Sequence, residues 1–468
     1  MPLYKEENFL IVHPGSQHTL FSFGLQDSLA PPQYRIPSIV YQDSITKDYK
    51  TKRQSEQDLE IHPIKASRIV DLDAFNYLLK IILQSVITNH PLVTINQIPL
   101  LLIVPSLGWS TNIEYITKYV IESLEFTAFN IIDLSLAATF GVGSSTNSVV
   151  VNVGYESIQI VPVVGYQSIK FAGKFLHNIG GKTLNEEIKK NLPNFSDQQI
   201  EDLKCSGIYE VLHEQDGNFY SWKDLQENGG GDEEEGDNFD VAKLVTKDNG
   251  PIAETGKLSG EEGEEAKPNK ELETNSFIDS ITQERISVGK ERFLGGNKLI
   301  EIISREIYAS LKNIPDIDKR QDCYDNIILV GSSFSIPGLK EAVLVKLNQD
   351  YLVRDPEIHG SNATTTTDGV SSAIMKYQQT SDDQADGESG STVNQVPNSI
   401  KMAKYPDYFP EWKKPKEKGG SWQDVYFLGG EICGKQIFST SSSHGRELFV
   451  GSDLYEERGP QSIWDVSV

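Results

Sequence analysis

Three glycine- or serine-containing turns hold the residues of this sequence that could do chemistry. They are Gly15-Ser16, Gly154-Tyr155 and Gly331-Ser332-Ser333. Each follows a short apolar run typical of a β-strand, and a turn at a strand end can present several backbone N–H groups to one phosphate. One such turn is a weak indicator, but three of them in one chain predict a nucleotide-binding cleft.

Other catalytic motifs are missing or incomplete. Gly181-Lys182-Thr183 resembles the end of a P-loop, but the first glycine of that motif would fall on Leu176. The sequence contains no Gly-x-Ser-x-Gly, and spacing alone suggests no pair of catalytic carboxylates. The three cysteines lie far apart, in no metal-like spacing. The remaining motifs therefore predict neither catalysis nor a metal site.

Two strand–turn–strand patterns position the first two turns. Apolar runs at 9–13 and 19–23 flank the first turn, and Val149–Val153 and Ile158–Val164 flank the second. Gly15 and Gly154 lie 139 residues apart, and further strands and helices follow each pattern. Duplicated α/β halves place a ligand between them. The predicted fold class is therefore α/β, with two halves around a central cleft.

An acidic segment at 213–276 interrupts this organisation. Between Glu214 and Glu273 it contains 18 acidic residues and 6 lysines. The resulting net charge of −12 is half of the chain's net charge of −24. Its apolar surface is too small to offset the entropy of ordering it, so we predict a disordered acidic insertion. Polar loops at 361–368 and 380–398 are expected to be mobile. The rest of the chain has no basic stripe and no membrane-length apolar run, which predicts neither nucleic-acid nor membrane binding.

Short motifs along the whole chain resemble those of actin and the actin-related proteins. IPSIV (36–40) is similar to actin's FPSIV, ISVGKERF (286–293) to ITIGNERF, FLGG (427–430) to WIGG, and YEERGP (455–460) to YDESGP. The resemblance implies an actin-like fold of the actin–sugar kinase–chaperone ATPase superfamily. On this fold the segments 1–150 and 401–468 form the first half, with a shortened peripheral subdomain near 34–70. The second half comprises 151–212 and 277–400, on either side of the insertion.

The resemblance also implies that the phosphate site has lost its chemistry. Actin's first phosphate turn begins with an aspartate that organises the metal's water shell, and a lysine follows; here His13 and Leu20 take these places. The aspartates of actin's second turn match Asn152 and Tyr155, and no glutamine that could orient a water occurs between Gln97 and Gln159. Magnesium needs oxygen ligands, and phosphoryl transfer depends on positioning and charge. We therefore expect no ATP hydrolysis, no metal and no cofactor, with passive ATP binding as the alternative. The degenerate phosphate turns comprise Gly15, Ser16, Asn152, Gly154, Gly331 and Ser332.

The run KYPDYFPEWK (404–413) is most similar to the fungal nuclear actin-related proteins of the class numbered nine. This resemblance implies a nuclear, non-catalytic subunit of a SWI/SNF- or RSC-type chromatin remodelling complex that regulates transcription. It also implies two partners, a long helix of the remodelling ATPase and a second actin-related protein. The loop between Val40 and Ile61 is short and no apolar plug follows Phe293, so we expect no filament.

Actins bind amphipathic helices in a cleft opposite the nucleotide. By resemblance, Tyr166 matches an aromatic residue of that cleft, and Phe140, Phe438 and Phe449 lie in matching segments. Core packing is the alternative interpretation of each. Two alternative functions remain open at this point. One is an actin-superfamily ATP-binding protein with weak ATPase activity, and the other is a cytoplasmic actin-related protein of a motor adaptor complex.

Overall fold

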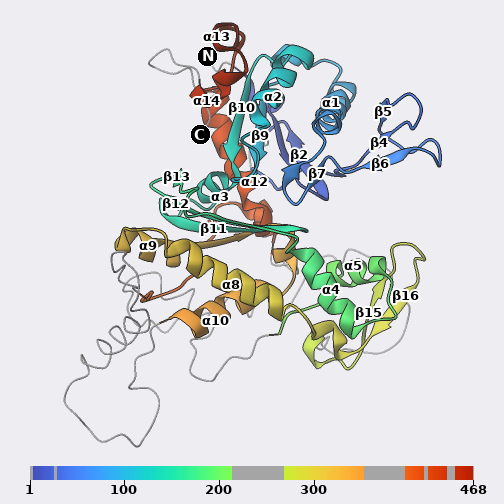
Figure 1. Cartoon of the computed structure of the whole chain (residues 1–468), viewed down its shortest axis with the longest axis vertical. Helices are drawn as coiled ribbons and strands as arrows, with labels where there is room; N and C mark the ends of the chain where they lie inside the picture. The colour runs from blue at the N-terminus through green and yellow to red at the C-terminus, as the bar shows by residue number, and fades with distance from the viewer. Residues whose placement is uncertain are drawn as a thin grey trace, which may run out of the picture.

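The computed structural model describes residues 4–25, 29–212, 268–352, 396–415, 420–439 and 448–466. Most of the predicted acidic insertion and most of both predicted mobile loops lie outside these residues. The α/β class is confirmed, because two mixed sheets with helices against them form the body of the molecule (Figure 1).

The first sheet has the strand order β10-β9-β1-β2-β3. Its strands are β1 (Leu10–Pro14), β2 (His18–Phe23), β3 (Tyr34–Pro37), β9 (Leu100–Val104) and β10 (Phe129–Asp133). The hairpin β1–β2 is antiparallel, whereas β1 pairs with β9 and β9 with β10 in parallel. The turn after β1 therefore lies at the same edge of the sheet as the ends of β9 and β10.

The second sheet repeats this arrangement with the order β13-β12-β11-β17. Its strands are β11 (Ser148–Val153), β12 (Ser157–Val164), β13 (Gln167–Ser168), β14 (Lys174–His177), which also pairs with β12, and β17 (Ile327–Val330). Again an antiparallel hairpin has a parallel neighbour, with Asn152 opposite Val330. A parallel bridge from Ile327 to Met402 extends the sheet by one chain segment. The two hairpins are thus the starting points of two similar halves.

Smaller elements complete the two halves. Three short strands, β4 (Val40–Gln42), β5 (Tyr49–Lys50) and β6 (Leu59–Ile61), form a peripheral sheet, and β7 (Ile64–Lys65) pairs with β8 (Arg68–Ile69). In the second half β15 (Asn275–Ile278) pairs with β16 (Arg285–Val288). The helices used below are α1 (Leu72–Asn89), α2 (Ile113–Lys118), α3 (Leu134–Val142), α4 (Gly181–Asn191), α5 (Asp197–Cys205), α8 (Asn297–Leu311), α9 (Ile317–Tyr324), α10 (Leu339–Tyr351) and α12 (Val425–Ser439).

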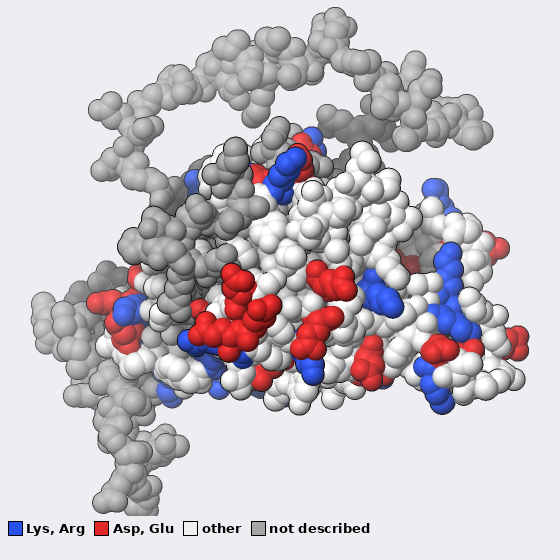
Figure 2. All heavy atoms as spheres, turned by 90° about the horizontal axis from the view of Figure 1, so that it is seen from above, with Lys and Arg blue, Asp and Glu red and all other residues white. Residues whose placement is uncertain are grey.

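The surface carries charges of both signs. On the face that Figure 2 shows, lysine and arginine side chains stand among aspartate and glutamate side chains, and no continuous basic patch forms there. No helix in the described ranges is both long and apolar enough to cross a membrane.

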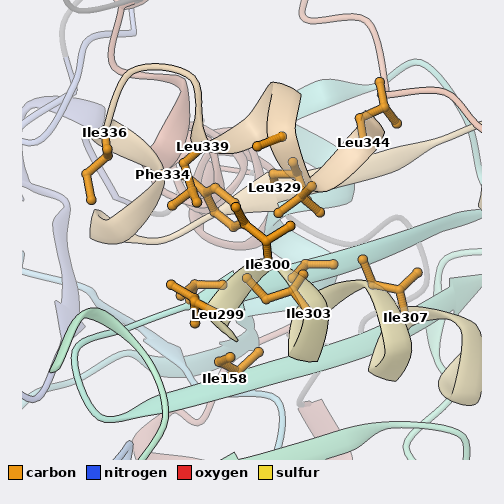
Figure 3. Close-up of a cluster of buried hydrophobic side chains, with 14 of the residues drawn as sticks. Ile158, Leu299, Ile300, Ile303, Ile307, Leu329, Phe334, Ile336, Leu339 and Leu344 are labelled. Carbon is orange, nitrogen blue, oxygen red and sulfur yellow. The ribbon is translucent and has the colours of Figure 1, made fainter. Parts of the chain in front are cut away.

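The core of the second half forms where α8 packs between its sheet and α10. Leu299, Ile303 and Ile307 recur at helical spacing and face the sheet strands and α10 (Figure 3). Each is fully buried, and burying one such side chain contributes about 1.5–3 kcal/mol. This packing gives the second hairpin a rigid support.

Close packing of α12 on α3 returns the C-terminal segment to the first half (Figure 1). A Cβ atom on Gly429 would collide with the carbonyl oxygen of Ala137, and one on Gly141 with the carbonyl oxygen of Val425. Only glycine allows the two backbones to approach this closely. The FLGG motif is therefore a helix-contact motif.

The end of the predicted acidic insertion needs correction. Residues 268–276, which the composition predicts to be disordered, include a short 3-10 helix and the start of β15. The fully buried Arg292 holds them, because its guanidinium donates to the carbonyl oxygens of Asn269 and Leu272, both at 2.6 Å. Asn269 also donates to the carbonyl oxygen of Ile208 (2.9 Å). The polar residues of this segment form hydrogen bonds with residues elsewhere in the sequence, and composition does not reveal such bonds.

Candidate functional site

All six residues of the predicted phosphate turns line one cavity, which we call the phosphate-turn cavity. Its volume is about 90 Å³, whereas pockets for small ligands usually have about 300–1,000 Å³. The duplicated hairpins and the end of β17 bring the turns together, as the strand ends predict. Residues at the mouth of the cavity also border a second hollow of about 620 Å³ beside α4 and α5.

The glycine N–H groups of the three turns are already hydrogen-bonded within the chain. Gly15 donates to the carbonyl oxygen of His18 (3.0 Å) and Gly154 to that of Ser157 (2.9 Å). Gly331 donates to the carbonyl oxygen of Gln423 (2.8 Å), far away in the sequence. A phosphate would have to break these bonds before it could use the same donors.

His13 lines the cavity in an uncharged state. Its Nδ1–H donates to the carbonyl oxygen of Ile103 (3.0 Å), and its ring packs on Tyr426 with the centroids 4.7 Å apart. Burial lowers the pKa of His13 to about 4, and the hydrogen bond to Ile103 only partly opposes this. At neutral pH the residue therefore supplies no positive charge to an anion in the cavity.

The carboxylate of the cavity is engaged as well. Asp424 accepts a hydrogen bond from the hydroxyl group of Tyr426 (3.1 Å) and lies 3.6 Å from the guanidinium of Arg35. Burial raises the pKa of Asp424, and the charge of Arg35 opposes that rise. In the described part of the chain no group of three or more His, Cys, Asp and Glu side chains could hold a metal ion.

The lysines of the second hollow are paired with acidic residues. The pairs are Lys182–Glu156 (3.4 Å), Lys189–Asp197 (3.2 Å) and Lys204–Glu201 (2.6 Å). Lys204 also lies over the ring of Tyr155, 5.4 Å from its centroid. This hollow is large enough for a small molecule, but its cations already have partners.

A turn that sequence reasoning missed bridges the two halves beside the phosphate-turn cavity. We call residues 64–69, the β7–β8 hairpin, the cleft strap. The backbone N–H of Ser67 donates to the hydroxyl oxygen of Ser16 (3.1 Å), and its hydroxyl group shares a hydrogen bond of 2.7 Å with that of Ser157. Trp109 donates to the carbonyl oxygen of Ser67 (2.9 Å). One residue thus links the turn regions of both halves.

A second link lies next to the cleft strap. The backbone N–H of Leu107, in the first half, donates to the side-chain oxygen of Gln159 on β12 (3.1 Å), and the Gln159 amide donates back to the carbonyl oxygen of Leu107 (3.1 Å). The buried Gln159 interrupts an apolar strand. Its position in that strand was the signal in the sequence, because a buried amide needs a partner.

Phe140 and Tyr166 come together at the C-terminal end of α3. Their rings stack with centroids 5.0 Å apart and an angle of 13° between the planes. Tyr166 has a φ of 58°, which is unusual for a non-glycine residue, and 40% of its surface is exposed. Its N–H donates to the carbonyl oxygen of Thr146 (3.2 Å). The chain therefore holds an exposed ring in a fixed orientation.

Tyr408 is a third aromatic residue at this place, and sequence reasoning did not single it out. It is 73% exposed, and its hydroxyl oxygen lies 3.9 Å from where a Cβ atom would stand on Gly143, the residue after α3. The signal in the sequence was the aromatic run around 404–413. We call Phe140, Tyr166 and Tyr408 the aromatic corner.

Phe438 and Phe449 do not contribute to an exposed cleft, which corrects their assignment to it. Both are buried, and both rings make edge contacts with Tyr4, at centroid distances of 6.4 and 5.8 Å. Phe438 packs in the same way on Phe9 (5.4 Å). The alternative interpretation, core packing, describes these two residues.

Two comparisons with known proteins bear on this arrangement. Residues 4–228 match the protein-family model described as Actin. A curated protein of Schizosaccharomyces pombe, "SWI/SNF and RSC complexes subunit arp9", is 24% identical to the chain in an alignment of 542 residues that covers 99% of both proteins.

Proposed function

From the premise that residues 4–228 are an actin-family domain in a chain of actin-like α/β fold, we propose that this protein is a non-catalytic subunit of a nuclear chromatin remodelling complex. The observation that carries the proposal is the end-to-end similarity to a subunit of the SWI/SNF and RSC complexes. Because one fold can host many functions, the function of this chain has to be argued from the phosphate-turn cavity and the aromatic corner.

The absence of catalysis is the first part of the proposal. Three turn N–H groups are engaged by carbonyl oxygens of the chain, His13 is uncharged at neutral pH, and Asp424 is bound by Arg35 and Tyr426. A phosphoryl-transfer site needs free donors and cations around the phosphates. These features support a protein that neither hydrolyses ATP nor requires a nucleotide or metal cofactor.

Binding of a partner helix is the second part. The aromatic corner presents three rings around the end of α3, two of them already stacked, and hydrogen bonds fix the backbone at Tyr166. Rigid, exposed aromatic side chains are effective anchors for an amphipathic helix. We propose that the long helix of the remodelling ATPase binds here, and that a second actin-related protein binds the same helix beside this chain. Movement of the helix would then be transmitted mechanically.

A role without filaments or nucleic acid is the third part. The chain passes from Phe293 to α8, which begins at Asn297, so no apolar plug fits between them. The mixed charges in Figure 2 favour protein partners over direct contact with nucleic acid.

Purification at native expression level tests the proposal. Three tagged chains are isolated gently from the cells that normally contain this protein: the wild type, Tyr166→Ala and the control Tyr115→Ala. The proteins that co-purify with each chain are identified by mass spectrometry. We expect a remodelling ATPase and a second actin-like chain with the wild type and the control, and their loss with Tyr166→Ala. Tyr115 is a suitable control because it is an exposed tyrosine on α2.

Three results would contradict the proposal. A stable free monomer without these partners would refute it, and co-purification of motor adaptor subunits, with the chain located in the cytoplasm, would favour the cytoplasmic alternative. Release of phosphate from Mg-ATP by the purified protein would favour the ATPase alternative.

A further inference from the structure

The end of α3 gives the aromatic corner a negative electrostatic character. The last carbonyl groups of a helix carry a partial negative charge, which favours a nearby cation. α3 ends at Val142, and Gly143 closes it with a bond from its N–H to the carbonyl oxygen of Thr139 (2.9 Å). The faces of the aromatic rings around this end are also negative, since the ring quadrupole attracts cations.

A carboxylate stands next to the corner in a fixed position. Asp322 on α9 accepts a hydrogen bond from the side-chain amide of Asn147 (2.9 Å), and the oxygen of the same amide accepts one from the N–H of Gly165 (2.8 Å). Gly165 directly precedes Tyr166. The amide of Asn147 therefore ties the carboxylate to the aromatic residue, although they belong to different elements.

Asp322 has no neutralising partner in the described part of the chain. It is exposed, and no ion pair links it to a lysine, arginine or histidine there. Asp407, the residue before Tyr408, is different, because it pairs with Lys413 at 2.9 Å. A carboxylate that accepts one hydrogen bond still has several lone pairs for a further donor.

We propose that the aromatic corner and Asp322 together bind one arginine side chain of the partner helix. A planar guanidinium can lie on an aromatic face and donate two hydrogen bonds to one carboxylate, whereas lysine offers only a point charge. Because one amide, that of Asn147, bonds both Asp322 and the N–H of the residue before Tyr166, we expect one long side chain to reach both the ring and the carboxylate. The helices α3 and α9 that carry Phe140 and Asp322 can be followed in Figure 1. The inference rests on the proposed function, because it names the chemistry of the partner at that site.

A double-mutant cycle with a synthetic peptide tests the inference. The probe is a fluorescent peptide of the long helix of the co-purified remodelling ATPase, with each arginine replaced in turn by citrulline, which has the same shape but no charge. Anisotropy titrations use the full-length wild type, Asp322→Asn and the control Asp318→Asn, which lies one turn earlier on α9. Tyr408→Leu is a further variant that removes a ring.

We expect one citrulline position to weaken binding to the wild type about tenfold, which corresponds to one exposed cation–π contact and one rim ion pair. The same substitution should change binding to Asp322→Asn only about threefold, because the cation–π contact remains and the ion pair is lost, while Asp318→Asn behaves like the wild type. A peptide that binds all variants with the same citrulline effect overturns the inference and leaves the proposed function standing. A peptide that does not bind the wild type at all contradicts the proposed function itself.

Discussion

The phosphate-turn cavity and the aromatic corner belong to the same two halves, yet they differ in whether their functional groups are bonded within the chain or exposed to solvent. In the cavity, polar groups form hydrogen bonds with other groups of the same chain: the N–H of Gly331 donates to the carbonyl oxygen of Gln423, and the hydroxyl group of Tyr426 donates to Asp424. At the corner the ring of Tyr166 and the carboxylate of Asp322 remain exposed. A site whose groups are satisfied internally contributes to stability, whereas a site with unsatisfied groups can contribute to binding.

This difference shows why backbone shape alone does not identify an active site. Both hairpins have the turns that a phosphate site needs, and both turns face one cavity. The decisive features are the partner of each N–H group, the charge of His13 and the small volume. Substitutions in the cavity should therefore lower stability without affecting the partner, and substitutions at the corner should do the reverse.

The largest expected effect comes from His13 and pH. Its pKa is about 4 in the folded protein and about 6.5 when unfolded. Below pH 6.5 the unfolded chain therefore binds a proton that the folded chain does not bind, and stability falls as the pH decreases. Between pH 6.5 and 4 this one residue should lower the free energy of unfolding by about 3 kcal/mol. Above about pH 7.5, where neither state binds the proton, it should have no pH effect.

Urea titrations followed by circular dichroism at several pH values measure this effect. His13→Gln should flatten the dependence over that range, and the exposed control His90→Gln should keep it. An equal slope in the wild type and His13→Gln would mean that the cavity does not hold an uncharged histidine.

Much of the cavity could be predicted, because its signals are local. The apolar runs around the turns predict both hairpins, and the identities of His13 and Asn152 predict the loss of actin's acidic residues. The cleft strap could not be predicted, since Ala66 and Ser67 adopt positive φ values of 47° and 56° that residue type does not favour. The bond from Gly331 to Gln423 joins distant segments, and no local pattern reveals it.

The corner was only half predictable for a different reason. A phenylalanine in a sequence does not reveal whether its side chain is exposed or buried, so sequence alone cannot distinguish Phe438 from Phe140. The contacts of Phe438 with Tyr4 and Phe9 in the folded chain make the difference. The order at 268–276 depends similarly on Arg292, a buried charge whose partners lie on another segment.

At the corner, Tyr166→Ala should weaken binding of the ATPase helix peptide by about 2 kcal/mol, the size typical of an aromatic anchor. The residue is 40% exposed and, among the residues that the structure describes, stacks on Phe140, so the melting temperature should change little. Anisotropy titration and thermal melting of the same samples measure both quantities, with Tyr115→Ala as the control. If the variant loses stability but binds the peptide normally, Tyr166 is part of the core and the comparison fails.

In the cleft, Gln159→Leu should lower the free energy of unfolding by about 1.5 kcal/mol. Leucine has a similar size but leaves the N–H and carbonyl groups of Leu107 without their partner, and an unpaired buried group costs about 1–3 kcal/mol. Urea unfolding measures the loss, and Gln57→Leu on the exposed surface is the control. Peptide binding should be unchanged. Reduced binding without reduced stability would show that the two regions are coupled and not separate.

The smallest expected effect is that of Mg-ATP on the wild type, and it tests the comparison most directly. A ligand at 100 times its dissociation constant stabilises a protein by about 2.7 kcal/mol, which raises the melting temperature by several degrees. We expect a shift below about 1 °C at millimolar Mg-ATP, because turn N–H groups and cations of the cavity and of the larger hollow are engaged within the chain. Lys182→Ala is the matched variant, since Lys182 lines that hollow at its exposed side. A shift of several degrees in the wild type that disappears in Lys182→Ala would place a nucleotide there, and the contrast between an internally satisfied cavity and an exposed corner would fail.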